Sequence, residues 1–281
     1  MKRLELGVTL ALVLSNLNLS AGGLADLVAS SCRVDRRDVW HGGERTIFEF
    51  RGCETWVVEP TVPRTDKAWV WIMEWPGAYA ERTGVPALLK AGFHIVTFRP
   101  GFYEEKGGKR VFQSRPGNMN DKRVAESREF QRFAVGTLGL APKCGLIGMS
   151  WGGFYSVRYA SFHPDCVGRI YLDAPLLDFS TLPGFSGAYY GVDSKTYVGK
   201  DDPRQPVNRA EPIAKAGIPI LLLYGGQDQT VPPAKNCELF IERFKAAGGV
   251  INFTKRPMYG HHPHGLEEHE QARFVNFFSG E

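Results

Sequence analysis

Short apolar runs alternate with helix-like segments along this chain, and that alternation is the feature that most restricts its fold. Residues 68–75, 144–149 and 218–226 are apolar on both faces of an extended strand, so we expect each of them to be buried on both sides. Segments with helical periodicity, among them residues 120–138 and 151–163, separate the apolar runs. We therefore predict an α/β fold with a mainly parallel, doubly wound sheet and helices on both faces.

The N-terminal part of this sheet is predicted to be antiparallel. Residues 46–50 and 55–58 are strand-like and are separated by the turn Arg51-Gly52, which predicts a hairpin. Residues 177–206 are rich in Gly, Pro, Ser and Tyr, have no clear period and connect two predicted strands. A connection of this length is typical of a cover over a site. We therefore predict a lid-like insertion within one domain, residues 33–281, rather than a second domain.

The beginning of the sequence is typical of a secretory signal peptide. Residues 1–3 are Met-Lys-Arg, residues 6–14 form an apolar run, and small residues follow at positions 20–22. The apolar run is too short to span a bilayer, and the alternative interpretation is an ordinary N-terminal helix. We expect residues 1–22 to be a signal peptide and the protein to be secreted or periplasmic, with no stable membrane span.

Charge and cysteine content argue against several functions. The formal net charge is only +4 and the basic residues are scattered, so we expect no nucleic-acid partner. The five cysteines lack a metal-binding spacing such as Cys-x-x-Cys. Cys32 and Cys53 could be joined in an oxidising compartment, although their positions do not fix that pairing. We expect neither a metal nor a cofactor.

Three predicted strands are followed by residues that can perform chemistry. Reactive groups in open α/β sheets lie in loops beyond the carboxyl ends of the strands. The strand at residues 144–149 is followed by Ser150, the strand at 218–226 by Asp228, and the strand at 250–257 by a histidine-rich loop. The chain order is therefore serine, aspartate, histidine.

The hexapeptide GMSWGG, residues 148–153, places Ser150 between a predicted strand and a predicted helix. The pattern G-x-S-x-G in this context predicts a sharp turn that exposes the serine hydroxyl. Gly148 and Gly152 supply the small flanking residues that such a turn needs. The alternative is a structural glycine-rich turn with no chemistry. We predict that Ser150 is a nucleophile.

A serine hydroxyl needs a base, and the base needs a carboxylate that fixes its tautomer. Asp228 is the leading carboxylate because it follows a buried strand and a Gly-Gly turn. Asp173, at the end of the strand at 169–175, is the rival acid, and Asp178 is a weaker rival. The alternative is that Asp228 only forms a turn or caps a helix and has no catalytic role.

The base is expected in the loop YGHHPHG. His261 is the leading candidate because it follows the Tyr-Gly turn directly, with His262 next, whereas His264 is expected to support the loop. Three close histidines also suggest a metal site, but the sequence has no cysteine or carboxylate at ligand spacing from them. Packing or surface roles are expected for the remaining histidines, His41, His94, His163 and His269.

An oxyanion formed at Ser150 needs two N–H donors. The backbone amide of Trp151, directly after the serine, is expected to be one donor. The second should come from the loop that follows residues 68–75, which begins Pro76-Gly77-Ala78-Tyr79. Proline has no N–H, so Ala78 is the first choice and Tyr79 the second.

These residues together resemble the α/β-hydrolase superfamily, over residues 40–278. More narrowly, the chain resembles a group of bacterial esterases and prolyl-oligopeptidase-like hydrolases. The stretches that carry the likeness are WVVEP, ALLKAGFHIV, GMSWGG, LDAPLLDF, AKAGIPILLLYGGQDQTVP and GHHPHGLE. The resemblance implies Ser150 as nucleophile, Asp228 as acid and His261 as base.

The leading hypothesis is a serine hydrolase that cleaves carboxylic esters through an acyl-enzyme without a cofactor. A small-molecule or carbohydrate O-acyl ester is the substrate hypothesis, because aromatic residues are expected in loops that border the site. These aromatics are Phe102, Tyr103, Phe185, Tyr189 and Tyr190. The alternatives are a serine peptidase of the prolyl-oligopeptidase type and a non-catalytic binding protein on a hydrolase fold.

Overall fold

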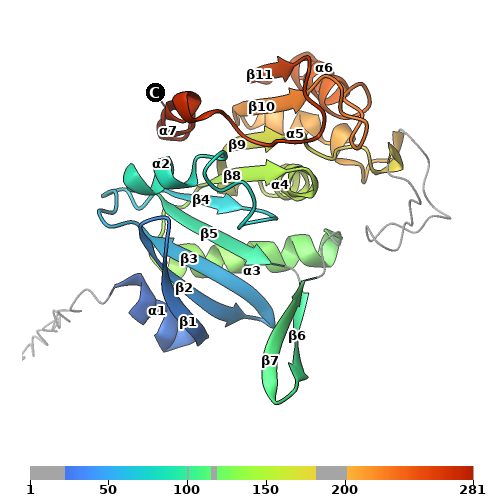
Figure 1. The fold of residues 1–281 in the computed structure, drawn as a ribbon. Coiled ribbons are helices and arrows are strands. Elements are labelled where there is room, and N and C mark those ends of the chain that lie inside the picture. The colour runs from blue at the N-terminus through green and yellow to red at the C-terminus, as the bar shows by residue number, and fades with distance from the viewer. Residues whose placement is uncertain (1–22, 100, 115–118, 182–200, 281) are drawn as a thin grey trace, which may run out of the picture.

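A nine-stranded sheet crosses the molecule in the computed structural model, which describes residues 23–99, 101–114, 119–181 and 201–280 (Figure 1). The strand order is β1-β2-β3-β5-β4-β8-β9-β10-β11, and all neighbours from β5 to β11 pair in parallel. The strands are β1 (Arg33–Trp40), β2 (Gly43–Phe50), β3 (Cys53–Glu59), β4 (Trp69–Ile72), β5 (His94–Arg99), β8 (Cys144–Met149), β9 (Val167–Asp173), β10 (Ile220–Gly225) and β11 (Ile251–Arg256). The prediction of a mainly parallel sheet is confirmed.

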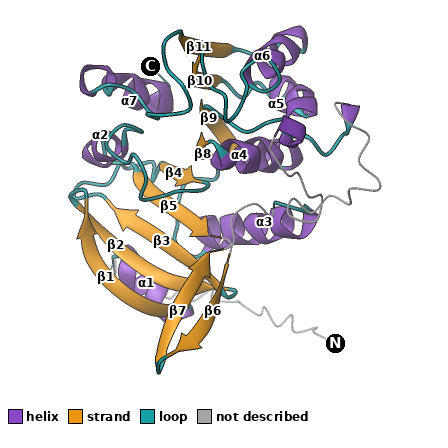
Figure 2. Ribbon diagram, turned by 45° about the vertical axis from the view of Figure 1, so that its right-hand side comes forward, coloured by secondary structure: helices purple, strands orange, loops and turns teal. Residues whose placement is uncertain are grey.

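Helices cover both faces of this sheet (Figures 1 and 2). One face packs against α1 (Leu24–Ser31), α3 (Asp121–Gly136), α4 (Trp151–Phe162), α5 (Ala210–Lys215) and α6 (Cys237–Ala246). The other packs against α2 (Val85–Lys90) and α7 (Ala272–Ser279). Two apolar cores therefore lie on opposite sides of the sheet, which explains why β4 and β10 are buried at every position.

The N-terminal strands are antiparallel, as predicted. β2 pairs with β3 in antiparallel register, with Phe50 opposite Cys53 across the turn. The sequence pattern did not predict β1, which pairs with β2 and forms the edge of the sheet. Its residues are exposed or half-buried and include five charged side chains, so they carry no apolar run. Charged residues are typical of an edge strand that must not pair further.

A second small sheet was also not predicted. β6 (Gly101–Lys106) and β7 (Lys109–Ser114) form an antiparallel hairpin that projects from the body of the protein (Figure 1). Two glycines, Gly107 and Gly108, make its turn with positive φ. The last helix, α7, begins at Ala272, and the chain before it makes a short 3₁₀ turn at Glu268–Glu270.

Some sequence predictions lie wholly or partly outside the described residues. Residues 1–22, predicted to be a signal peptide, lie entirely outside the described residues. Residues 182–200 of the predicted lid-like insertion also lie outside them. The cysteines can be compared directly: Cys32 and Cys53 are both free thiols, so the structure contains no bridge between them. No helix in the described part of the chain is long and apolar enough to cross a membrane.

Close packing of β8 against α4 creates the turn that carries Ser150. A Cβ added at Gly148 would lie 2.5 Å from Ser156 Oγ, and one added at Gly153 would lie 2.2 Å from Pro175 Cβ. Both distances are far below van der Waals contact. The glycines are therefore required because strand, helix and the segment after β9 meet at this point.

We expect Gly153→Ala to lower the free energy of unfolding by about 1–3 kcal/mol, because the new methyl group overlaps Pro175. Gly136→Ala is the matched control, since nothing lies within 4 Å of a Cβ at that position of α3. This control should be neutral or more stable by about 0.5–1 kcal/mol. Chemical denaturation of both variants makes the comparison, and equal stabilities would contradict the packing argument.

Candidate active site

Ser150 has a backbone conformation that non-glycine residues rarely adopt, with φ 48° and ψ −113°. Hydrogen bonds fix both ends of the residue. Its N–H donates to the Asp173 carbonyl oxygen at 2.9 Å, while its own carbonyl oxygen accepts from the amides of Gly153 at 3.0 Å and Leu176 at 2.8 Å. Strain of this kind persists only where the surroundings hold it, and it is concentrated at functional sites.

Ser150, His261 and Asp228 form a continuous hydrogen-bonded chain. The Ser150 hydroxyl lies 3.0 Å from His261 Nε2, and His261 Nδ1 lies 2.7 Å from Asp228 Oδ2. Both partners of the second bond are almost fully buried, with side-chain exposures of 8% and 1%. Asp228 Oδ1 accepts the backbone amides of Thr230 and Val231 at 2.9 and 2.8 Å, so the carboxylate cannot rotate freely.

The rival residues form a second pair of their own. His264 Nδ1 lies 2.7 Å from Asp173 Oδ1, and both side chains are only 4% exposed. Asp173 Oδ2 accepts the Gly265 amide at 2.6 Å and also the Tyr171 hydroxyl. Asp173 therefore supports the histidine loop, whereas His261 is bonded to Asp228. The weaker rival, Asp178, accepts the amide and hydroxyl of Ser180 within its own turn.

His262 lies beside this chain of residues but points elsewhere. Its Nδ1 lies 3.2 Å from the Tyr79 hydroxyl, and the two rings stack with an interplanar angle of 14°. Partial burial, followed by the neighbouring imidazoles of His264 and His261, lowers the pKa of His262. Of the two histidines proposed from the sequence as the base, only His261 is in contact with Ser150.

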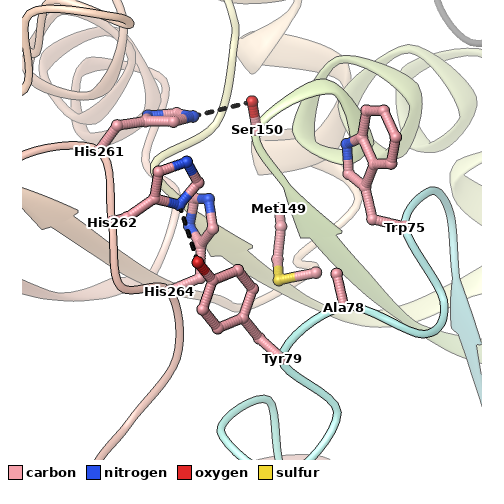
Figure 3. Close-up of a pocket in the computed structure, with 8 residues that line it drawn as sticks. All are labelled: Trp75, Ala78, Tyr79, Met149, Ser150, His261, His262 and His264. Carbon is pink, nitrogen blue, oxygen red and sulfur yellow. Dashed lines mark hydrogen bonds between the residues drawn. The ribbon is translucent and has the colours of Figure 1, made fainter.

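A cavity of about 220 Å³ opens directly at Ser150. Figure 3 shows the histidines on one side of the cavity, Trp75 and Ala78 on the other, and Tyr79 next to His262. The lining residues are Trp75, Ala78, Tyr79, Met149, Ser150, His261, His262 and His264. Phe102 and Tyr103 do not line it, since both belong to β6, and the Tyr103 hydroxyl donates to Asp35 at 2.6 Å. Phe185, Tyr189 and Tyr190 lie outside the described residues.

The loop after β4 corrects the prediction of the second oxyanion donor. The Ala78 amide donates to the Trp75 carbonyl oxygen at 2.9 Å and closes a turn, so it is not available for an oxyanion. Trp75 and Tyr79 both have positive φ, which reverses the chain direction around the cavity. The Trp75 amide donates to the Glu74 side chain, so the Tyr79 amide, the second choice from the sequence, is the better candidate in this loop. Trp151 is the first residue of α4, the position at which helical amides point outward.

A buried carboxyl group, Glu74, lies beneath this loop and was not predicted from the sequence. Glu74 is 1% exposed, its Oε1 accepts the Trp75 amide at 3.3 Å, and its Oε2 has no partner among the described residues. Burial raises the pKa of Glu74 to about 7, against weaker lowering by the Trp75 amide and the charge of Arg99. The signal that could have found it is its position, since Glu74 lies within residues 68–75, which are predicted to be buried.

Comparisons with known proteins agree with the fold. Residues 75–203 match the family described as the alpha/beta hydrolase fold. A protein of Methylorubrum extorquens with the provisional name carboxymethylenebutenolidase is 31% identical over 131 residues, which cover 46% of this chain and 37% of that protein. The chain thus matches little more than a third of the length of this relative.

Two solved structures share the fold at low sequence identity. Dipeptidyl peptidase 4 of Porphyromonas gingivalis is 14% identical with a TM-score of 0.60, over 85% of this chain and 35% of that chain. Acetyl xylan esterase 1 of Thermoanaerobacterium is 14% identical with a TM-score of 0.55, over 91% and 90% of the two chains. The strand order, the matched segment and these likenesses show that the chain has the α/β-hydrolase fold.

We expect Glu74→Gln to change the pH dependence of stability. In the folded protein Glu74 keeps its proton up to about pH 7, whereas the unfolded carboxyl loses it near its ordinary pKa of 4.5. The stabilising effect of the raised pKa is therefore complete below pH 4.5 and is lost as the pH rises to 7. Relative to the native chain, Glu74→Gln should gain roughly 3 kcal/mol between pH 4 and pH 8.

Denaturant unfolding at several pH values measures this gain. Glu44→Gln, at an exposed position of β2, is the control and should follow the native pH profile. A constant difference between Glu74→Gln and the native chain over the whole pH range would refute the titration of Glu74.

Proposed function

We propose that this protein is a serine hydrolase that cleaves carboxylic esters, with Ser150 as nucleophile, His261 as general base and Asp228 as the orienting acid. One observation carries the proposal: a single imidazole joins the Ser150 hydroxyl to a buried carboxylate through its two ring nitrogens. This is the arrangement that activates serine in hydrolases of unrelated folds.

The reaction follows from this geometry in two halves. Ser150 Oγ attacks the ester carbonyl carbon while its proton passes to His261 Nε2, and the imidazolium then protonates the departing alcohol. Water attacks the resulting acyl-serine with His261 again as base, and the acid is released. Asp228 keeps the Nδ1 proton of His261 directed away from the serine and stabilises the imidazolium.

Backbone amides supply the stabilisation of the oxyanion in this proposal. Trp151 contributes the amide at the N-terminus of α4, where helical N–H groups favour negative charge. Tyr79 contributes the second amide from the loop that lines the cavity. Glu74 holds the Trp75 amide from beneath, so neutral Glu74 favours an oxyanion above it more than ionised Glu74 does.

The size of the cavity favours a small acyl group. At about 220 Å³ it is smaller than sites for drug-sized ligands, which range from about 300 to 1,000 Å³. Trp75 and Tyr79 provide aromatic surface at its rim. An acetyl or similarly short acyl ester is therefore the proposed substrate, with the alcohol part extending past the rim. The acetyl xylan esterase likeness agrees with an ester substrate but supports the fold alone.

Ser150→Ala tests the nucleophile. We expect it to lower kcat for p-nitrophenyl acetate by about 10⁵- to 10⁶-fold, as removal of a triad serine does elsewhere. A fluorophosphonate probe should label the native chain at Ser150 and leave the variant unlabelled, as read by peptide mass spectrometry. Equal turnover by the two proteins would refute the role of Ser150. Faster hydrolysis of p-nitroanilides than of esters would instead support the peptidase alternative.

Comparing Asp228→Asn with Asp173→Asn tests which carboxylate acts on the base. Asp228→Asn should lower kcat by about 10⁴-fold because the His261 tautomer is no longer fixed. Asp173→Asn should have a smaller effect on kcat and lower the unfolding midpoint, since Asp173 holds the histidine loop. A larger loss of kcat in Asp173→Asn, at equal stability, would reverse the assignment.

A further inference from the structure

Three imidazoles beside Ser150 form a cluster that the proposed hydrolysis uses only in part. The ring centroids of His261, His262 and His264 are 4.8–4.9 Å apart in every pair. One nitrogen from each ring lies within 4.8 Å of the corresponding atoms of the others. Figure 3 shows all three rings on the same side of the cavity. The proposed reaction needs one of them, so the placement of the other two has a different origin.

Each of the three rings has its Nδ1 held by an oxygen atom. His261 Nδ1 is 2.7 Å from Asp228, and His264 Nδ1 is 2.7 Å from Asp173. In the third ring, Nδ1 lies 3.2 Å from the Tyr79 hydroxyl. When Nδ1 donates its proton to such a partner, Nε2 presents a lone pair. Histidines that bind metals in proteins are oriented by outer partners of this same kind.

The charges around the cluster also suit a cation. Two buried carboxylates, Asp228 and Asp173, lie directly behind two of the imidazoles. They can offset part of the charge of a divalent ion without binding it. Imidazole ligands are preferred by Zn²⁺ and by the other later first-row transition metals, and three imidazoles leave one position open for water. His262 is exposed, so the cluster is accessible from solvent.

We propose that the Nε2 atoms of His261, His262 and His264 form a binding site for Zn²⁺ or a similar divalent transition metal. Zinc–nitrogen bonds are about 2.1 Å long, so the three atoms must approach one another more closely than 4.8 Å. The His262 ring is exposed and is held only by the 3.2 Å contact with the Tyr79 hydroxyl and by stacking on that ring, so it can shift when a metal binds.

Binding at this site has a consequence for catalysis, which rests on the proposed function. The lone pair of His261 Nε2 is the one that accepts the Ser150 proton. A metal bound to that nitrogen removes the base and breaks its hydrogen bond to the serine. The site is therefore inhibitory, and the inhibition is reversed when a chelator removes the metal.

Metal binding can be tested without any catalytic readout. Ser150→Ala protein without a histidine tag, carrying Cys32→Ser because Cys32 is the cysteine that is not buried, is titrated with Zn²⁺ against a chromophoric chelator. We expect one equivalent to bind with micromolar or tighter affinity. His262→Gln should weaken binding by at least about 10-fold, because loss of a ligand costs no less than loss of an outer partner, whereas His269→Gln, an exposed histidine outside the cluster, should not.

A second measurement separates the metal site from the proposed function. With Ser150 intact, Zn²⁺ should slow fluorophosphonate labelling at the concentration that fills the site, and EDTA should restore the native rate. Unchanged affinity in His262→Gln, or no zinc binding in the micromolar range, would overturn the site. Full labelling of zinc-loaded protein would overturn its inhibitory role. Absence of labelling without metal would refute the serine hydrolase and leave the titration result valid.

Discussion

Asp173, at the end of β9, is the residue on which the arrangement of the site depends. Its backbone carbonyl oxygen fixes the amide of Ser150, and its carboxylate fixes His264 and the Gly265 amide. One buried residue therefore connects the turn after β8 to the loop after β11, which are far apart in the sequence. The distance between Ser150 Oγ and His261 Nε2 is set through this connection, because both groups are attached to segments that Asp173 holds.

Much of this arrangement could be predicted because it follows from local patterns. The buried parallel strands are apolar throughout, and the Ser150 turn is marked by glycines that close packing requires. Pairing between side chains could not be predicted in the same way. The sequence left Asp228 and Asp173 as rivals, and only the register of adjacent strands assigns one to His261 and the other to His264.

Features without a periodic or compositional signal were missed or assigned wrongly. β1 and the β6–β7 hairpin are largely polar, so no apolar alternation marks them. Ala78 was expected to be an oxyanion donor because Pro76 has no N–H. In the structure the Ala78 amide is occupied by a turn hydrogen bond. Glu74 gains its raised pKa from burial by distant segments, which no single stretch of sequence reveals. The missed strands are polar, whereas the errors at Ala78 and Glu74 concern hydrogen bonding and burial, where packing decides the outcome.

The sheet has an antiparallel part and a parallel part, and this division has an evolutionary consequence. The residues around the cavity follow β4 and β8 or belong to the loop after β11, and Asp228 follows β10, so all of them depend on the parallel half. The antiparallel strands β1, β2 and β3 form the opposite end and supply none of the residues that line it. That half can acquire insertions, new edge contacts or altered charge while the chemistry stays intact. A lineage of such proteins can therefore diversify its attachments at one end of the sheet and conserve its reaction at the other.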